Sequence, residues 1–303
     1  MTIPVRYLSI HEEQPGRVYW DQTVLARPFR WLDGEEGDGL DGLDPVGPLV
    51  VVVPGRMHYG REAELAALLA PYQRLVFVAT GDEEGRFDAV AAAPNAAGWW
   101  RQTPPGDPAP ARILPLGPAP LDWNGRCLPV EARDLRWCFA GQVTHARRHE
   151  AASVLLQSVP GGLLVASDRF AAGLPRDQYA QLLGRAKVIP CPSGPVHPET
   201  FRVWEAIEAG CVPLVDRYTS DGRIWDGLWE SLGIPNTLRV DDWRGLPVLV
   251  DQACDGWQTT ANRLQASWAQ RQHVLARDMR DQLGLDQPEV TTIVTMSPQP
   301  PPP

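Results

Sequence analysis

One stretch, residues 187–216, constrains the fold more than any other part of the chain. It reads KVIPCPSGPVHPETFRVWEAIEAGCVPLVD. The apolar runs at residues 187–191 and 212–215 are typical of buried strands, and the amphipathic pattern at residues 198–209 predicts a helix that ends at a glycine. Strands joined through a helix lie parallel in one sheet. The sequence therefore predicts an α/β protein, with the turn at residues 192–197 on the carboxyl edge of a parallel sheet.

That turn has the features of an anion site. Open α/β sheets bind ligands at the carboxyl ends of their strands. The turn contains Ser193 and Gly194, and we expect Pro198 at the first helical position, where a missing N–H has no consequence. The free N–H groups at a helix start attract anions. Glu205 then lies roughly 10 Å along the helix. A phosphate at the helix start and a sugar hydroxyl near Glu205 would suit a nucleotide.

The same residues carry a family resemblance. The run PSGPVHPETFRVWEAIEAGCVPLV resembles the nucleotide-sugar-binding core of exostosin-like glycosyltransferases, and its second half is similar to a signature of many GT-B enzymes. The resemblance covers about residues 137–218. It implies a GT-B fold, with two Rossmann-like domains whose parallel sheets face each other across a cleft. It also implies that Glu205 holds the ribose of the donor nucleotide. Many GT-B enzymes have a further glutamate eight residues earlier, where this chain has His197.

Length and charge agree with a two-domain enzyme. At 303 residues the chain is long enough for two modest cores. We expect an acceptor-side Rossmann-like domain at residues 1–125, a nucleotide-sugar-binding Rossmann-like domain at residues 126–285, and a flexible Pro-rich tail at residues 286–303. The formal net charge of −9 argues against broad electrostatic binding to DNA or to an anionic membrane.

The cysteines and the start of the chain indicate a cytoplasmic protein. There are five cysteines and no C-x-x-C pair, and Cys138, Cys191 and Cys211 lie in apolar runs. This pattern is typical of buried thiols in a reducing compartment. The first residues lack the basic and apolar regions of a signal peptide, and no apolar run approaches the ~20 residues that span a bilayer.

A second strand–helix–strand unit occurs in the first half of the chain. The apolar runs PLVVVVP (residues 48–54) and RLVFVAT (residues 74–80) predict buried parallel strands, and residues 61–72 between them predict a helix. The loops that follow the two strands, residues 55–60 and 81–86, lie at the carboxyl edge. In a two-domain cleft enzyme these loops face the opposing domain.

The remaining pattern completes the two domains. A first strand is expected at residues 5–10, and the Pro- and Gly-rich residues 94–130 are expected to form an irregular crossover with one short strand at residues 112–116. In the second domain, further strands are expected at residues 135–140, 162–166 and 237–240, and helices at residues 145–159, 175–184, 225–232 and 242–279, the last one interrupted near Gly256.

The segment FAGQVTHARRHEA is similar to the first strand–helix junction of the exostosin-like family. Gly141 opens this junction, and in the family an arginine early in the helix approaches the donor diphosphate. Arg147 and Arg148 are the matching candidates. A guanidinium suits this task because it pairs with two phosphate oxygens at once. An exposed basic helix face is the alternative interpretation.

A nucleotide-diphosphate sugar donor assigns roles to the other polar residues. The arginines, the Ser193 and Gly194 amides and the Thr200 hydroxyl would stabilise the leaving diphosphate. His197 would donate to a phosphate or to the donor sugar, or else support the helix entry. The family inverts the anomeric centre, which requires one general base. We place this base in the first domain; the candidates, which are equally well explained as polar loop residues, are His58, Asp82 and Glu83.

No metal or cofactor is expected. The chain has no D-x-D triplet, and His145 and His149 lie four residues apart with no third ligand in the pattern. Similar GT-B enzymes act without an essential metal, with the nucleotide sugar as a co-substrate. The absence of G-x-S-x-G argues against a hydrolase, and no G-x-G-x-x-G follows a predicted strand, which argues against an NAD-dependent enzyme.

These features predict an inverting, metal-independent glycosyltransferase. It would move a sugar from a nucleotide-diphosphate sugar, UDP-linked by resemblance, to an acceptor hydroxyl on a saccharide. Two alternatives stay open. One is transfer to a modified base in DNA, against which the acidic charge balance counts. The other is a nucleotide-sugar-binding protein without turnover, which would lack a base facing the donor from the first domain.

Overall fold

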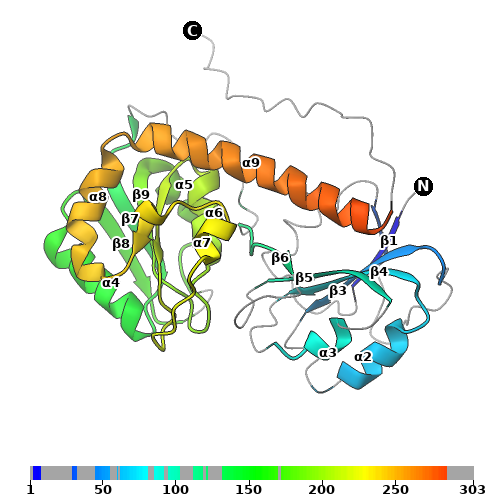
Figure 1. The fold of residues 1–303 in the computed structure, drawn as a ribbon. Coiled ribbons are helices and arrows are strands. Elements are labelled where there is room, and N and C mark those ends of the chain that lie inside the picture. The colour runs from blue at the N-terminus through cyan, green and yellow to red at the C-terminus, as the bar shows by residue number, and fades with distance from the viewer. Residues whose placement is uncertain are drawn as a thin grey trace, which may run out of the picture.

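A computed structural model shows two parallel sheets, each with helices packed against it, joined by a crossover and by a long C-terminal helix (Figure 1). This arrangement is a mixed α/β fold with two Rossmann-like domains, as predicted. The structure describes residues 3–7, 29–32, 45–54, 60, 62–80, 85–91, 95–102, 112–118, 121, 132–169 and 172–284.

The first sheet has the strand order β2-β1-β3-β4-β5-β6, and all its strands are parallel. Strands β3 (Pro48–Pro54) and β4 (Arg74–Thr80) have the predicted limits. Helix α2 (Glu62–Leu69) lies between them, and the short helix α3 (Asp88–Ala91) follows β4. Strand β1 (Ile3–Tyr7) begins two residues before the predicted strand. Strand β2 (Phe29–Leu32) was not predicted from the sequence.

The expectation of an irregular segment after residue 94 is wrong in part. Residues Ala96–Arg101 form strand β5, which pairs with β4, and the short strand β6 (Arg112–Ile113) pairs with β5. Neighbouring strand residues point to opposite faces. Trp99 packs into the cluster on the α2 side, and Trp100 packs into the larger core that continues into the second domain. The Gly- and Pro-rich surroundings concealed this strand.

The second sheet has the order β11-β10-β9-β7-β8 and is parallel throughout. The predicted strands are all present, with bounds that differ by a few residues at most. They are β7 (Leu135–Gln142), β8 (Gly162–Ser167), β9 (Ala186–Cys191), β10 (Val212–Asp216) and β11 (Arg239–Val240). Helices α4 (Ala146–Ser158) and α5 (Arg176–Arg185) also match. Cys138, Cys191 and Cys211 are buried free thiols, and burial raises the pKa of Cys191 far above its usual range.

Helix α6 (Phe201–Glu208) begins later than predicted. Thr200 is its N-cap residue, so Pro198 does not occupy the first helical position. The backbone N–H of Glu199 donates to Nδ1 of His197 at 3.2 Å, and this bond holds the chain before the helix in a turn. Glu205 is therefore the fifth helical residue, roughly 6 Å from the helix start at 1.5 Å per residue.

The C-terminal helix connects the two domains. A short helix α7 (Leu228–Ser231) precedes β11, and helices α8 (Leu246–Cys254) and α9 (Trp257–Gln282) are separated at Gly256, which has a φ of 76°. This confirms the predicted interruption. Helix α9 crosses back to the first sheet (Figure 1), where Gln282 accepts a hydrogen bond from the Trp100 indole at 2.7 Å and Asp278 pairs with Arg112 at 2.9 Å.

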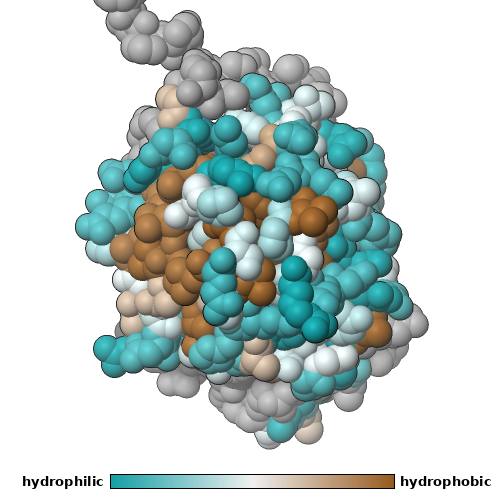
Figure 2. All heavy atoms as spheres, turned by 90° about the vertical axis from the view of Figure 1, so that its left-hand side faces the viewer, coloured by the Kyte–Doolittle hydropathy of each residue, from teal (hydrophilic) through white to brown (hydrophobic). Residues whose placement is uncertain are grey.

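Apolar side chains gather on the face of the second domain that points away from the first sheet (Figure 2). The exposed large apolar residues of this domain include Leu156, Leu163 and Val248.

Within the described part of the chain, no helix combines the length and apolarity needed to cross a bilayer. The predicted boundary at residues 125 and 126 and the tail at residues 286–303 lie outside the described residues.

Candidate functional site

The candidate site lies at the carboxyl edge of the second sheet, where the segments after β7 and β9 meet. The carbonyl oxygen of Ser193 is the meeting point. Arg148 Nε donates to it at 3.0 Å, and His145 Nε2 lies 3.0 Å from it. Arg148 Nη1 also donates to the carbonyl of Gln142 at 3.2 Å. The fold thus brings the predicted residues Arg148 and Ser193 together from segments 45 residues apart.

Both basic side chains at this meeting point are affected by burial. Burial, and then the neighbouring Arg202, lowers the pKa of Arg148 to about 9, so Arg148 still carries its charge at neutral pH. Burial, and then Arg148, lowers the pKa of His145. A neutral His145 must donate from Nε2 to the Ser193 carbonyl, which leaves Nδ1 as an acceptor. The site therefore combines a buried cation with a histidine held in one tautomer.

Several buried polar atoms in this region have no hydrogen-bond partner among the described residues. Buried polar side-chain atoms in proteins are nearly always hydrogen-bonded. These atoms come from the ends of strands β7 and β9 and from the start of helix α6. They are His145 Nδ1, Ser193 Oγ, His197 Nε2, Thr200 Oγ1 and Arg202 Nε. These five atoms lie at one sheet edge, which makes this edge the candidate for binding a polar ligand.

Arg202 was not among the residues predicted from the sequence. It lies in the first turn of α6, donates from Nη2 to the carbonyl of Ala140 at 3.0 Å, and stacks 4.6 Å from the ring centre of Phe139. Gly141 has a φ of 151°, and a Cβ atom there would collide with the Arg202 guanidinium. A signal was present in the sequence, because Arg202 precedes Glu205 by three residues and such residues share a helix face.

Glu205 is buried on helix α6, with 5% of its surface exposed. The hydroxyl of Tyr179, from α5, donates to its carboxylate at 2.6 Å. Burial raises the pKa of Tyr179 well above its usual range, and the negative charge of Glu205 adds to this effect. Tyr179 therefore stays protonated and orients the Glu205 carboxylate as a hydrogen-bond acceptor.

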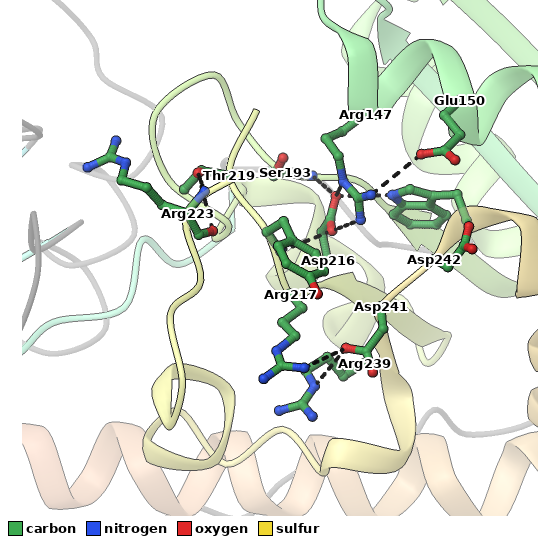
Figure 3. A network of polar contacts seen from close by, with 12 residues as sticks. Arg147, Glu150, Ser193, Asp216, Arg217, Thr219, Arg223, Arg239, Asp241 and Asp242 are labelled. Carbon is green, nitrogen blue, oxygen red and sulfur yellow. Dashed lines mark hydrogen bonds and ion pairs between the residues drawn. The ribbon is translucent and has the colours of Figure 1, made fainter. Parts of the chain in front are cut away.

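The geometry gives different roles to three groups that were predicted to bind a diphosphate. Arg147 forms an ion pair with Asp216, which is fully buried at the end of β10 (Figure 3). The backbone N–H of Ser193 donates to Asp216 at 3.3 Å, and that of Gly194 donates to the carbonyl of His197 at 2.8 Å. Both amides therefore have partners within the protein, and the Ser193 hydroxyl is the group left without one.

Asp216 is a second site residue that was not predicted from the sequence. It receives hydrogen bonds from Arg147 Nε at 3.0 Å and from the Trp243 indole at 3.0 Å (Figure 3). Together with the Ser193 bond, these contacts link the segments after β7, β9, β10 and β11. The sequence feature that could have indicated Asp216 is its position as a charged residue directly after the apolar run at residues 212–215.

His197 is a neutral donor. Its Nδ1 accepts from the Glu199 N–H, so Nε2 carries the proton. The side chain is 3% exposed, and its ring centre lies 4.5 Å from that of Trp225 in an edge-on arrangement. Burial, and then Arg223, lowers the pKa of His197 to about 3. The His197 ring therefore does not gain a charge at physiological pH.

The remaining predictions for the site concern the general base and a metal. His58, Asp82 and Glu83, the candidates for a general base, lie outside the described residues. Within the described ranges, no three His, Cys, Asp or Glu side chains gather as metal ligands.

Comparison with known proteins supports the fold. No protein-family model matches the chain, and no curated protein matches it in sequence. Among solved structures, the chain is similar to HepE of Anabaena, which was crystallised in complex with UDP. The fold is shared. The TM-score is 0.50 at 9% sequence identity, and the match covers 94% of this chain and 100% of HepE.

Proposed function

We propose that the protein is a glycosyltransferase of the GT-B type that uses a nucleoside-diphosphate sugar, with UDP as the nucleotide. The observation that carries this proposal is the set of unpartnered buried polar atoms at the carboxyl edge of the second sheet. The fold similarity to HepE, whose structure contains UDP, supports it. The exostosin-like sequence pattern lies at the same edge.

The diphosphate would lie over the start of helix α6. Hydroxyl groups of Ser193 and Thr200 would donate to its oxygens, and the amides of the first helical turn favour negative charge there. Arg202 and Arg148 supply positive charge close to these hydroxyls. These donors are already oriented by the protein, so they stabilise the charge that develops on the leaving group.

The ribose would lie beside Glu205. The Tyr179 hydroxyl fixes this carboxylate as an acceptor, which suits the two donor hydroxyls of a ribose. His197 offers one neutral N–H donor, which suits an oxygen of a phosphate or of the transferred sugar. Arg147 then acts through Asp216, as a residue that positions the surrounding segments.

The transfer would be a single displacement with inversion. The acceptor oxygen attacks the anomeric carbon, the bond from that carbon to the phosphate oxygen breaks, and the nucleoside diphosphate leaves. The acceptor proton passes to one general base in the first domain, for which His58, Asp82 and Glu83 are the candidates. We propose a saccharide acceptor, and a reaction in which arginine side chains rather than a metal balance the leaving charge.

Calorimetric titration of UDP, CDP, GDP and ADP, without added metal, tests the donor site. We expect UDP to bind the wild type and Arg202→Gln to weaken that binding tenfold or more, since a hydrogen bond to a charged group contributes about 1.5–3 kcal/mol. Arg185→Gln is the matched control, because Arg185 is exposed and pairs with Asp134 away from the site. If none of the four nucleotides binds the wild type, or if Arg202→Gln binds UDP as tightly as the wild type, the proposed site is wrong.

A turnover assay separates a transferase from a binding protein. Many transferases slowly hydrolyse their donor when water replaces the acceptor, so release of UDP from a UDP-sugar panel is the readout. If the wild type releases UDP from a UDP-sugar and the Arg202→Gln variant does not, the result supports catalysis. Binding of UDP together with no release from any UDP-sugar, with or without saccharide acceptors, supports the binding protein.

A further inference from the structure

Two connections join the domains, and both meet at Glu199. The crossover after β6 reaches Glu199 through Leu116, whose backbone N–H donates to Oε1 at 2.8 Å. The Trp204 indole, from α6, donates to the same oxygen at 2.7 Å. Trp204 in turn stacks on Trp268 of α9, with ring centres 4.1 Å apart. One carboxyl oxygen therefore ties together the crossover, α6 and the helix that returns to the first sheet.

The second oxygen of this carboxyl is in a different situation. Glu199 is 2% exposed, and its Oε2 is buried without a hydrogen-bond partner among the described residues. Arg271, on α9, interacts with the carboxyl electrostatically, but its own Nε is also buried and unpartnered. Burial raises the pKa of Glu199 to about 7, although the hydrogen bonds from Leu116 and Trp204 and the charge of Arg271 oppose this shift.

We propose that the protonation state of the Glu199 carboxyl controls how the two domains are held together. We call this device the Glu199 latch. When the carboxyl is neutral, Oε1 accepts the hydrogen bonds from Leu116 and Trp204, and the crossover, α6 and α9 keep the positions seen in the structure. Ionisation places negative charge on a buried oxygen that has no hydrogen-bond partner among the described residues, and such burial is unfavourable. The ionised protein therefore favours a state in which water reaches Oε2. The crossover bonds to the other oxygen of the same carboxyl, and α9 is linked to this carboxyl through Trp204 and Arg271. Admitting water at Oε2 therefore loosens both connections and changes the separation of the two sheets.

Among the described residues at this junction, Glu199 is the group whose pKa lies near neutrality. From α9 the charged group that faces it is Arg271; burial lowers the pKa of this guanidinium and the charge of Glu199 raises it, and an arginine side chain keeps its proton in proteins. The crossover contributes the uncharged Leu116 amide, and α6 contributes the uncharged Trp204 indole. On the preceding turn, His197 has a pKa lowered to about 3 and stays neutral. Between pH 6 and pH 8, the charge at this junction therefore changes at Glu199.

Distance measurement between spin labels on the two domains tests the latch in the full chain. Ala67 on α2 and Gln157 on α4 are both exposed and serve as the labelling positions. Replacing Cys127 and Cys254 with serine leaves the buried cysteines unlabelled. In this background we expect the distance distribution to shift between pH 6 and pH 8, with a midpoint near 7. Glu199→Gln should keep the pH 6 distribution at both pH values.

Two further variants make the result decisive. Glu230→Gln changes an exposed glutamate elsewhere in the domain and should respond to pH as the labelled parent does. Arg271→Gln removes the charge that favours the ionised carboxyl, so its midpoint should move to higher pH. The proposal is overturned if the parent distribution does not change with pH, if Glu199→Gln shifts as the parent does, or if Arg271→Gln leaves the midpoint in place. The first and third criteria apply even if Glu199→Gln does not fold.

Discussion

Arg147 and Asp216 form a two-pronged ion pair across the carboxyl edge of the second sheet, between residues 69 positions apart in the chain. Asp216 is fully buried, and it accepts hydrogen bonds from the Arg147 guanidinium on α4 and from the Trp243 indole, which follows the neighbouring strand β11. Four strand ends are thereby held in one arrangement. The backbone N–H of Ser193 donates to the same carboxylate, so this pair also contacts the segment after β9.

Removing the charge of Asp216 is expected to destabilise the protein. Asp216→Asn leaves Arg147 without its anion, and breaking a buried pair from one side costs about 3–5 kcal/mol. Urea unfolding followed by tryptophan fluorescence measures this loss. Asp251→Asn is the control, because its pair with Arg136 is mostly exposed and such pairs contribute little. Equal stability of the two variants would contradict a central role for Asp216.

The stability of the protein should fall as pH rises toward 7 because of Glu199. Below the usual carboxyl pKa of 4.5 the group is protonated in both the folded and unfolded states. Between 4.5 and about 7 the unfolded chain loses this proton while the folded chain keeps it, so the folded state loses stability over that window. A shift of this size corresponds to about 3 kcal/mol.

Glu199→Gln tests this dependence. It should be more stable than the wild type at pH 8, with the difference shrinking toward pH 4.5. Urea unfolding at pH 5 and pH 8 checks the expectation, and Glu230→Gln serves as the control for the same chemical change at an exposed position. A difference from wild type that is the same at both pH values would rule out the raised pKa.

His197 should stay neutral and keep its proton on Nε2 between pH 5 and pH 8. Burial lowers its pKa to about 3, and its Nδ1 accepts from the Glu199 amide. Nitrogen-15 shifts of the histidine rings report both the charge and the tautomer, and His197→Asn identifies the signal. Titration with a midpoint near 6.5 would show that the ring is open to water.

Gly141→Ala should disturb the candidate site directly. The added Cβ collides with the Arg202 guanidinium and is strained at a φ of 151°, so we expect a loss of about 1–3 kcal/mol in the free energy of unfolding. We also expect weaker UDP binding. Gly173→Ala is the matched control, because nothing lies within 4 Å of a Cβ there. The double variant Gly141→Ala with Arg202→Ala should regain stability relative to Gly141→Ala, and no recovery would mean that Arg202 is not the obstacle.

The sequence by itself determined the local structure and the edge at which the site lies. The limits of β3 and β4, the break at Gly256 and the strand–helix junctions around Ser193 all follow from apolar periodicity and from the backbone preferences of glycine. The same patterns placed Arg148 and Glu205 at one sheet edge. Pro and Gly in the surrounding residues concealed β5, because they weakened the periodic signal on which the prediction depends.

Only the tertiary structure decided which polar groups have partners within the described part of the protein and which do not. Periodicity reports which face of a strand or helix is buried, but the partner of a buried charge comes from a distant part of the chain. Arg147 is engaged because Asp216 lies beside it, and Arg202 approaches Gly141 because its guanidinium donates to the carbonyl of Ala140 at the end of β7. Glu199 titrates near neutrality because the crossover and α9 close over it. These properties depend on desolvation and on contacts between elements, which no local pattern encodes.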